Sequence, residues 1–407
     1  MISSGWRKAR IGEIAEVKGG KRLPAGYYLQ ATPTHRPYIR VADMRVGGVD
    51  QSDIKYVPEG AISRIQNYRI YKDDIFISVA GTLGIVGRVP ISLDGANLTE
   101  NADRLTNIKC DVAYLMYALQ SNPIQDEIDS IRTVGAQPKL ALSRIRSFEI
   151  LMPSDQAEQS RVSRALSDTD DLIESLERLI SKKKAIKQGM MQELLTGRTR
   201  LSGFTEPWTN IVLGDVARFG KGSGLPKSAL TSSGFTPCIH YGELFTHYGP
   251  EIIHVTSRTN LTDRMVVSED FDVLMPTSDV TPRGLAKASS IHERGVVLGG
   301  DIMIIRPDKG RAHGPFLAHA IRHDANQVLQ FVRGSTVYHL YAADMQNFTL
   351  AIPSVEEQRV IAQVLRDADY EIDTLHRRLE SARNIKQGMM QELLTGRTRL
   401  PVEEVSS

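Results

Sequence analysis

Two stretches of the chain place apolar residues at alternating steps of four and three. In the first stretch these positions are Val162, Leu166, Thr169, Ile173, Leu176 and Ile180. In the second they are Ile361, Leu365, Ala368, Ile372, Leu375 and Leu379. This spacing predicts the a/d seam of a coiled coil. We therefore expect two long helices, the first over residues 154–195 and about 60 Å long at ~1.5 Å per residue.

Glycines mark the ends and two interior points of these expected helices. Gly197 and Gly396 stand where each helix would stop, because a left-handed glycine commonly closes a helix. Gly189 and Gly388 fall inside the pattern. We expect them to kink the helix or to allow close approach of a neighbour. Ser354 and Glu357 are spaced as a capping box for the second helix.

The sequence contains an internal repeat. Residues 186–201 and residues 385–400 both read IKQGMMQELLTGRTRL, at an offset of 199. Weaker matches extend through both halves: Trp6 corresponds to Trp208, and residues 11–15 correspond to residues 213–217. Between such anchors the halves differ almost completely. Each half is thus a variable lobe followed by a nearly invariant helical segment.

The repeat bears on how the helices pack. One amphipathic helix alone would be expected to lie on its own lobe. Two copies with matched seams favour pairing with each other, antiparallel, about a pseudo-two-fold axis inside one chain. We place the first lobe at 1–152, the first spacer helix at 153–201, the second lobe at 202–352, the second spacer helix at 353–400 and a tail at 401–407.

Both lobes are expected to be mixed α/β. Short apolar runs bounded by Gly- and Pro-rich turns predict strands. The strands are expected at residues 37–41, 74–79, 145–152, 273–275, 301–305 and 348–352, and helices at 112–120 and 315–323.

Composition narrows the class of protein. The 407 residues carry 50 Lys and Arg against 48 Asp and Glu, a net charge of +2, so any DNA-binding surface requires local segregation of charge. Cys110 and Cys238 alone can build neither a disulfide framework nor a zinc site. We find no membrane-spanning run and no apolar signal core at the N-terminus, and expect the cytoplasm.

Catalytic motifs were sought within the chain. Residues 219–224 (FGKGSG) resemble a loop that holds S-adenosylmethionine, but the matching stretch of the first lobe lacks the pattern and no Asn-Pro-Pro-Tyr element follows. The same loop departs from a P-loop in length and in having Gly222 at the Ser/Thr position. The histidines show no metal-binding spacing. We expect no catalytic residue, metal or cofactor in this chain.

The layout resembles the specificity subunit of type I restriction-modification systems over nearly the whole chain. The resemblance rests on two variable lobes, two near-identical helical segments, residues 81–84 (GTLG), residues 135–140 (GAQPKL) and the repeated KQGMMQELLTG. The second lobe departs from it, with residues 276–279 (PTSD) and 334–338 (GSTVY) in place of the first two motifs.

The resemblance implies that each lobe is a target recognition domain for half of a split DNA sequence. It implies paired helices that set the spacing and dock two methyltransferase subunits, which bring S-adenosylmethionine and methylate adenine. Two motor-nuclease subunits would add ATP- and Mg-dependent translocation and cleavage. Because the lobes differ inside, we expect two different half-sites. Two alternatives stay open: a related system that fuses methylation and cleavage in one polypeptide, and a stand-alone coiled-coil DNA-binding protein. A chain that itself methylates or cuts DNA would need a site that its motifs do not reveal.

Polar and basic loop residues are the candidate DNA contacts, because Arg pairs with guanine and Gln with adenine in the major groove. In the first lobe they are Lys18, Lys21, Arg22, Arg40, Arg45, Arg64, Arg69, Gln137 and Lys139. In the second lobe they are Lys221, Lys227, His240, Arg258, Arg283, Lys287, Arg333 and Tyr338. For each, a solvated surface charge is the competing interpretation.

Overall fold

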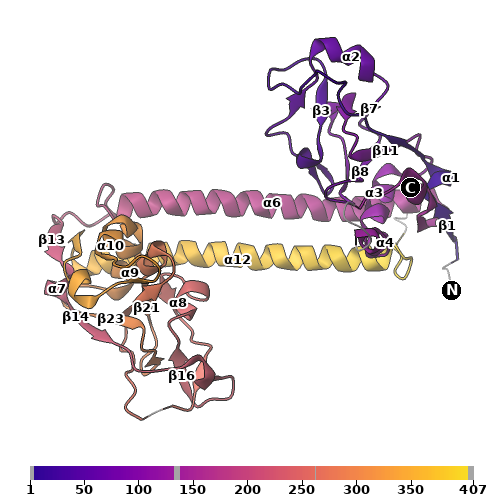
Figure 1. Ribbon diagram of the computed structural model, residues 1–407. Coiled ribbons are helices and arrows are strands. Elements are labelled where there is room, and N and C mark those ends of the chain that lie inside the picture. Colours follow the sequence, from indigo (N-terminus) through magenta and orange to yellow (C-terminus); the bar gives the residue numbers. More distant parts are fainter. Residues whose placement is uncertain (1–3, 133–137, 262, 402–407) are drawn as a thin grey trace. The chain divides into compact units, whose positions relative to one another are not determined.

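The computed structural model describes residues 4–132, 138–261 and 263–401. Its contacts divide the chain into two compact units, which are described separately. Unit 1 comprises Met1–Glu177 and Arg378–Ser407, and unit 2 comprises Arg178–Arg377. Each unit holds one lobe and about half of each long helix, α6 (Gln156–Leu194) and α12 (Val355–Leu393) (Figure 1).

The lobe of unit 1 contains two four-stranded sheets and a short two-stranded sheet that joins the lobe to the helices. The joining sheet pairs β1 (Trp6–Arg10) with β12 (Glu149–Pro153), antiparallel. One four-stranded sheet has a core that includes residues of the long helices, and we call it the proximal sheet. Its strand order is β2 (Glu16–Gly19), β11 (Ala102–Thr106), β8 (Ile75–Ser78), β9 (Val86–Arg88). The distal sheet has the order β6 (Lys55–Tyr56), β3 (Pro37–Ile39), β10 (Ala96–Leu98), β7 (Arg69–Ile70), and β4 (Met44–Arg45) pairs with β5 (Gly48–Val49). The helices are α1 (Ile11–Ile14), α2 (Glu59–Ile65), α3 (Val112–Gln120), α4 (Asn122–Arg132) and α5 (Leu142–Ser147), with 3-10 turns η1 (Val41–Asp43) and η2 (Ile91–Leu93).

The lobe of unit 2 repeats this plan with different strand lengths and with a fifth strand in the proximal sheet. The joining sheet pairs β13 (Thr209–Val212) with β25 (Thr349–Ile352). The proximal sheet runs β14 (Ala217–Lys221), β23 (Ile302–Pro307), β19 (Val273–Pro276), β21 (Ser289–Ile291), β17 (Glu251–Ile252). The distal sheet runs β15 (Leu230–Thr231), β18 (Arg258–Thr259), β16 (Thr236–Ile239), β22 (Val297–Leu298), and β20 (Ser278–Asp279) pairs with β24 (Tyr338–His339). The helices are α7 (Leu213–Val216), α8 (Glu243–Thr246), α9 (Gly314–His323), α10 (Ala325–Phe331) and α11 (Ala342–Met345), with η3 (Lys227–Ala229) and η4 (Pro282–Ala286).

Most expected elements occur where the pattern predicts them, and one strand is corrected. The helix expected at residues 112–120 is α3, and the helix expected at 315–323 is α9. The strand expected at 145–152 begins only at Glu149, because the residues before it form α5. Leu142, Ile145 and Phe148 recur every three residues, which is a helical rather than a strand period.

The interior glycines do not disturb the long helices. Helices α6 and α12 are each a single run of 39 residues that passes through Gly189 and Gly388. A Cβ atom built on either glycine would meet no other described atom within 4 Å. The expected kink and the expected close approach within the chain are therefore both wrong. Gly197 and Gly396, just past the helices, have φ angles of +69° and +68°, as a helix-closing glycine requires.

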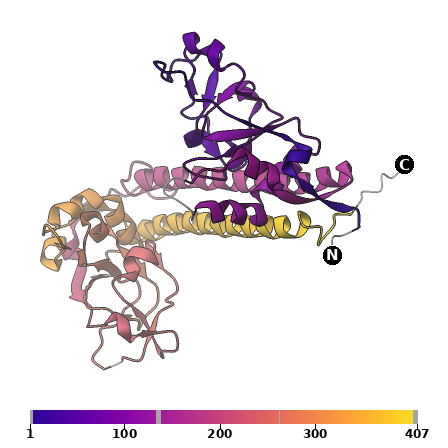
Figure 2. The same cartoon turned by 45° about the vertical axis from the view of Figure 1, so that its right-hand side comes forward.

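Within each unit, segments of α6 and α12 lie side by side and antiparallel (Figures 1 and 2). In unit 1, Lys386 pairs with Asp170 at 2.6 Å and Arg383 with Glu177 at 2.5 Å. In unit 2, Lys187 pairs with Asp369, and Lys183 pairs with Glu371 at 2.7 Å. The residue numbers rise on one helix as they fall on the other. The Lys386–Asp170 and Lys187–Asp369 pairs are related by the same offset of 199 as the sequence repeat.

The expected seam residues divide by position along the helices. Val162 and Leu166 join the proximal core of unit 1, whereas Ile361 and Leu365 join that of unit 2. The other seam residues lie between the helices. Five of them are buried, namely Leu176, Ile180, Ile372, Leu375 and Leu379, and three are half-buried, namely Thr169, Ile173 and Ala368. The ends of the helices are thus part of the lobe cores, which fastens each lobe to its helices.

A four-residue clasp closes each lobe onto the repeat. In unit 1, Arg399 donates two hydrogen bonds to the buried Glu158, at 2.8 and 2.7 Å, and Trp6 Nε1 donates a third at 3.3 Å. The fourth residue is Gly396, whose absent Cβ would lie 2.9 Å from the Trp6 ring. In unit 2 Arg200 binds Glu357 with hydrogen bonds of 2.7 and 2.6 Å, and a Cβ on Gly197 would lie 3.1 Å from the Trp208 ring. The third hydrogen bond is missing from this clasp, because Trp208 Nε1 is buried without a partner among the described residues.

The second clasp modifies the expected capping box. Ser354 accepts a hydrogen bond from the backbone N–H of Glu357 at 3.4 Å, as expected. The Glu357 carboxylate binds Arg200 instead of reaching back to the helix start.

The glycine-rich loop at residues 219–224 also has a structural explanation. A Cβ on Gly222 would lie 2.0 Å from the carbonyl oxygen of Gly299, so only glycine fits where the two strands converge. Gly20 holds the same place in unit 1, 2.0 Å from the carbonyl oxygen of Thr99. The loop therefore serves strand packing in both lobes.

Candidate functional site

Around the distal sheet of unit 1, basic side chains lie over tyrosine rings. Lys21 lies 5.5 Å from the Tyr68 ring, Arg64 5.5 Å from Tyr27, and Arg69 5.6 Å from Tyr71. Tyr27 and Tyr68 both pack against the small apolar cluster under α2, so the structure brings these candidates together. Because aromatic faces hold cations in place without neutralising them, this surface offers ordered positive charge for a phosphate backbone.

Arg22 and Arg40 differ in how far they are committed to the fold. Arg22 is exposed and donates a 2.6 Å hydrogen bond to Glu100. Arg40 is enclosed by the buried Asp43, whose carboxylate it binds with two nitrogens at 2.9 and 2.5 Å, and it also reaches Asp53. These hydrogen bonds to Asp43 raise the pKa of Arg40. Arg40 thus orders the loop between β3 and β5.

Lys18, Arg45 and Lys139 are the remaining described candidates of unit 1. Lys18 pairs with Glu16 at 2.6 Å, and Arg45 pairs with Asp50 at 2.9 Å. Lys139 is exposed near the buried Asp103. Burial raises the pKa of Asp103 to about 6, although Lys139 and Arg146 oppose that effect. Gln137 lies outside the described residues.

In unit 2, a cavity opens beside the β20–β24 pair. Its volume is about 390 Å³, and polar side chains that can donate or accept hydrogen bonds line it, namely Lys221, Thr277, Ser278, His339 and Tyr341. Tyr338, a candidate from the sequence, lies on β24 opposite Asp279. Arg333 lies close along the chain and donates a 2.7 Å hydrogen bond to Asp344. Three of the sequence candidates, Lys221, Arg333 and Tyr338, therefore occur in or near one surface of this lobe.

The other candidates of unit 2 are dispersed. Lys227 lies on η3 and Arg283 on η4, both exposed. Arg258 contacts the carbonyl of Phe235 at 3.3 Å. His240 and Lys287 are more committed to the fold: the His240 N–H donates to Glu243 at 2.7 Å, and Lys287 donates to the Phe245 carbonyl at 2.6 Å.

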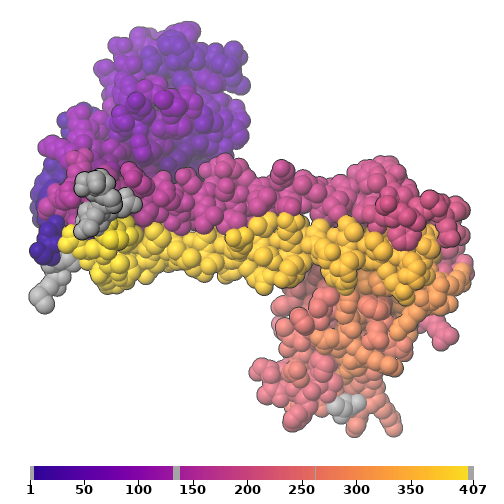
Figure 3. All heavy atoms as spheres, turned by 180° about the vertical axis from the view of Figure 1, so that it is seen from behind, coloured from indigo at the N-terminus to yellow at the C-terminus, as the bar shows by residue number. Residues whose placement is uncertain are grey.

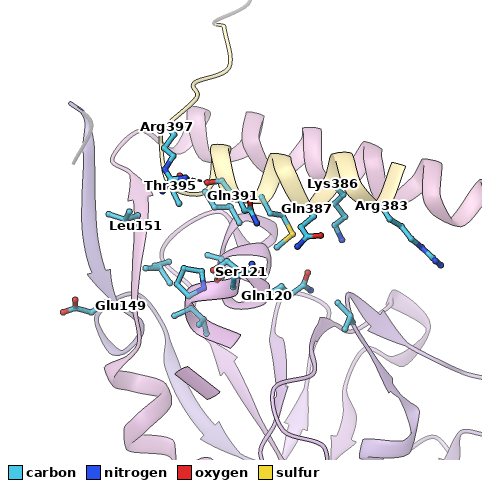
Figure 4. A pocket seen from close by; sticks show the side chains of 18 residues that line it. Gln120, Ser121, Glu149, Leu151, Arg383, Lys386, Gln387, Gln391, Thr395 and Arg397 are labelled. Atoms are coloured by element: carbon cyan, nitrogen blue, oxygen red, sulfur yellow. Dashed lines mark hydrogen bonds between the residues drawn. The ribbon is translucent and has the colours of Figure 1, made fainter. Parts of the chain in front are cut away.

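A groove of about 610 Å³ separates α12 from the lobe of unit 1 (Figure 4). Arg383, Lys386, Gln387 and Gln391 form its α12 side, and Gln120 and Ser121 lie across from them. The floor is apolar, with residues such as Ile150, Met390 and Leu394.

Unit 2 has a comparable hollow of about 700 Å³, where Leu195 and Thr196 take the places of Leu394 and Thr395. There the Gln327 side chain bonds both the N–H and the carbonyl of Thr349, at 2.6 and 2.9 Å, and covers the edge of β25. The two hollows thus share the repeat and differ on the lobe side.

A family model for the type I restriction modification DNA specificity domain matches the chain twice, over residues 3–185 and 205–383. The two matches follow the two lobes and the helices behind them. The chain belongs to this family. A member is a DNA specificity subunit, which supplies recognition and is itself non-catalytic.

Individual comparisons agree with this assignment. The specificity chain is 23% identical to a putative type I restriction enzyme MjaX specificity subunit of Methanocaldococcus jannaschii, over 89% of this chain and 87% of that protein. Its fold is similar to that of a type I restriction-modification S subunit from M. genitalium, with a TM-score of 0.63, 19% identity and 96% of both chains covered. It is also similar, with a TM-score of 0.57 and 16% identity over 98% of this chain and all of the other, to a structure titled for complex assembly and conformational transition of the type I R-M system.

One group of interacting residues in this specificity subunit has no signature in the sequence. The buried Glu251 on β17 accepts a 2.6 Å hydrogen bond from His292 and pairs with Arg366 of α12 at 3.2 Å; His319 lies 3.6 Å away. Burial alone would raise the pKa of Glu251, but these partners lower it to about 2. The residues are far apart in sequence and differ in type, so only the folded topology could reveal that they tie the proximal sheet to α12.

Across residues 4–132, 138–261 and 263–401, no group of three or more His, Cys, Asp and Glu side chains is arranged to hold a metal ion. Over the same ranges, no helix has both the length and the apolar character needed to cross a membrane.

Proposed function

We propose that this subunit reads a split, asymmetric DNA target in the cytoplasm, one half-site per lobe, and carries the catalytic subunits of a type I enzyme. The observation that supports this proposal is the contrast between the parts that the two halves share and the loops in which they differ. The Arg–Glu pair of the clasp, the joining sheet and one inter-helix Lys–Asp pair occur in both halves, while the exposed loops of the two lobes differ. A shared frame with different loops favours two readers of unlike half-sites.

Direct contacts are proposed for the exposed cations and their neighbours. In unit 1 the basic side chains over Tyr27, Tyr68 and Tyr71 would contact the phosphates of the DNA backbone. In unit 2 the cavity beside β20 and β24 would face the DNA bases. Phosphate contacts position a protein on DNA, and base contacts specify the sequence. The long helices would then hold the half-sites about one turn of DNA apart, ~34–36 Å, so that both face the protein.

The repeat itself supports docking of two copies of one partner. Ile186 and Ile385 are 45% and 56% exposed, and Gly189 and Gly388 face open space in the described chain. A glycine inside a helix costs about 1 kcal/mol relative to alanine, and no neighbour within the described chain offsets that cost. Figure 3 shows that one flank of α12 is uncovered. We infer that a methyltransferase subunit approaches each copy of the repeat over its exposed isoleucine and the glycine next to it.

The remaining subunits and cofactors follow from the family. Two methyltransferase subunits would supply S-adenosylmethionine and methylate adenine. Two restriction subunits would supply ATP- and Mg-dependent translocation and cleavage. This chain would contribute recognition and attachment to both reactions.

The deciding experiment is co-expression of the chain with the methyltransferase subunit encoded beside it, followed by single-molecule sequencing of host DNA for methylated adenine. We expect a split, asymmetric motif that disappears when this chain is deleted, and two methyltransferase copies per chain by native mass spectrometry. Methylation that persists without the chain would overturn the proposal. A chain that binds DNA but no methyltransferase would indicate a stand-alone DNA-binding protein.

A further inference from the structure

Two sequence segments in which the lobes depart from each other come together at one surface. In unit 1 the N–H of Leu140 donates to the carbonyl of Val79 at 3.0 Å, and in unit 2 the N–H of Leu340 donates to the carbonyl of Thr277 at the same distance. This shared hydrogen bond places the two segments in register in both lobes. In this register residues 81–84 (GTLG) of unit 1 correspond to residues 279–282 (DVTP) of unit 2, and the segment that leads to Leu140 corresponds to the one that leads to Leu340.

In unit 2 the departing segments pair as strands β20 and β24. Ser278 lies opposite His339, and Asp279 lies opposite Tyr338. The next pair of positions in this antiparallel register is Val280 and Val337. These valines are 72% and 43% exposed, so the pair ends in apolar side chains that the lobe itself does not cover.

Polar groups lie close to the valines along the chain. Val280 stands two residues after Ser278, and Val337 stands two residues before His339, in bends just outside the two strands. Ser278 and His339 line the 390 Å³ cavity, which Lys221 also borders. The surface thus combines an apolar end with hydrogen-bonding groups next to it.

Of the groups on base edges in the major groove, only the thymine 5-methyl is apolar. From this match we infer that Val280 and Val337 contact a thymine methyl in the half-site read by unit 2. The inference rests on the proposed function and adds one base type to it. The polar lining of the cavity would bind the neighbouring base edge.

Deoxyuridine provides the test, because it differs from thymidine only by that methyl group. Once the methylated motif is known, each thymine of both half-sites is replaced in turn. Binding of the complex of this chain with its methyltransferase is then measured by competition at fixed salt. We expect one position at which deoxyuridine weakens binding about fourfold, the effect of removing one buried methyl group.

Variants assign the effect to the valines. The double variant Val280→Ala and Val337→Ala should bind the natural site about as weakly as wild type binds the deoxyuridine site, and should no longer distinguish the two. Val267→Ala, at a 43% exposed valine elsewhere in the same lobe, should keep the full discrimination. Melting curves check that the variants are folded. The comparison of thymidine with deoxyuridine uses the wild-type protein, so it holds even if a variant does not fold.

The outcomes separate this inference from the proposed function. If wild type is indifferent to deoxyuridine at every thymine, or the motif has no thymine on either strand, the inference fails and the reader role stands. If the double variant still discriminates, another residue contacts the methyl. If no motif depends on this chain, the proposed function has failed first.

Discussion

At the scale of single residues, charged groups in this chain fall into those that build the frame and those that remain exposed. Arg40, Glu158 and Glu251 are bound on several sides, whereas Arg22 and Arg258 are exposed. The sequence indicated which residues could contact DNA but could not make this division. It depends on partners that are distant along the chain, as with Arg399 and Glu158.

The clasps yield the first residue-scale prediction. Arg399→Ala leaves the buried Glu158 carboxylate without its cation, so unit 1 should unfold at a clearly lower urea concentration. Urea unfolding followed by Trp6 fluorescence in a Trp208→Phe background measures it, since Trp6 donates to Glu158. Arg397→Ala is the matched control, because Arg397 is exposed and its ion pair with Glu392 is long, at 3.9 Å. This substitution should lower the free energy of unfolding by less than about 0.5 kcal/mol. Adding Glu158→Gln to Arg399→Ala should restore part of the loss. Equal effects of the two arginine variants would contradict the clasp.

A second prediction concerns acid. Burial lowers the pKa of His313 to about 4. Because this lies below the unfolded value of about 6.5, the folded state resists protonation, and stability present above pH 6.5 is lost as pH falls toward 4. Unit 2 should lose about 2 kcal/mol over that range, after allowance for partial exposure. Hydrogen exchange in α9 at pH 7, 5.5 and 4.5 measures it. His313→Gln should remove most of the dependence, and an unchanged slope in that variant would refute the assignment.

At the scale of elements, the sequence predicted the long periodic helices best. The seam and the closing glycines located both ends of α6 to within two residues, and the expected capping residue Ser354 lies one residue before the start of α12. Short elements were harder: the distal sheets use strands of two to four residues, and α5 was hidden inside an apolar run that also suited a strand. Their positions are set by tertiary packing, which periodicity over so few residues does not encode.

The helices carry the element-scale prediction. Deleting residues 172–178 and 371–377 removes one heptad from each helix and preserves the seam on both sides. About 10 Å of helix is lost, so the target should keep both half-sites and shorten its spacer by about three base pairs. Sequencing of methylated DNA gives both quantities. A changed half-site with an unchanged spacer would show that the helices do not set the distance.

At the scale of the whole molecule, the chain begins and ends at the same clasp. Arg399 reaches the carbonyl of Ser4 at 3.5 Å, and Trp6 contacts the same Glu158. The residues between Arg200 and Trp208 make the equivalent connection in unit 2 as continuous chain. The repeat could be recognised in the sequence, but the individual clasp residues required the structure.

A circular permutant tests that relationship. Joining residue 401 to residue 4 through a short flexible linker and opening the chain between Leu201 and Pro207 retains every residue of both clasps. The permutant should fold with a melting temperature within a few degrees of the original and direct methylation to the same motif. A permutant that folds but recognises a different motif would show that the break alters the spacing of the lobes.

Because each unit has a clasp, each lobe is also an exchangeable module. Because both lobes are anchored by the same Arg, Glu, Trp and Gly arrangement, either could be replaced by a copy of the other without altering the anchor. A chain that carried one lobe twice would present two identical readers. Its target would then be a palindrome, so the asymmetry of the natural target would come from the loops alone.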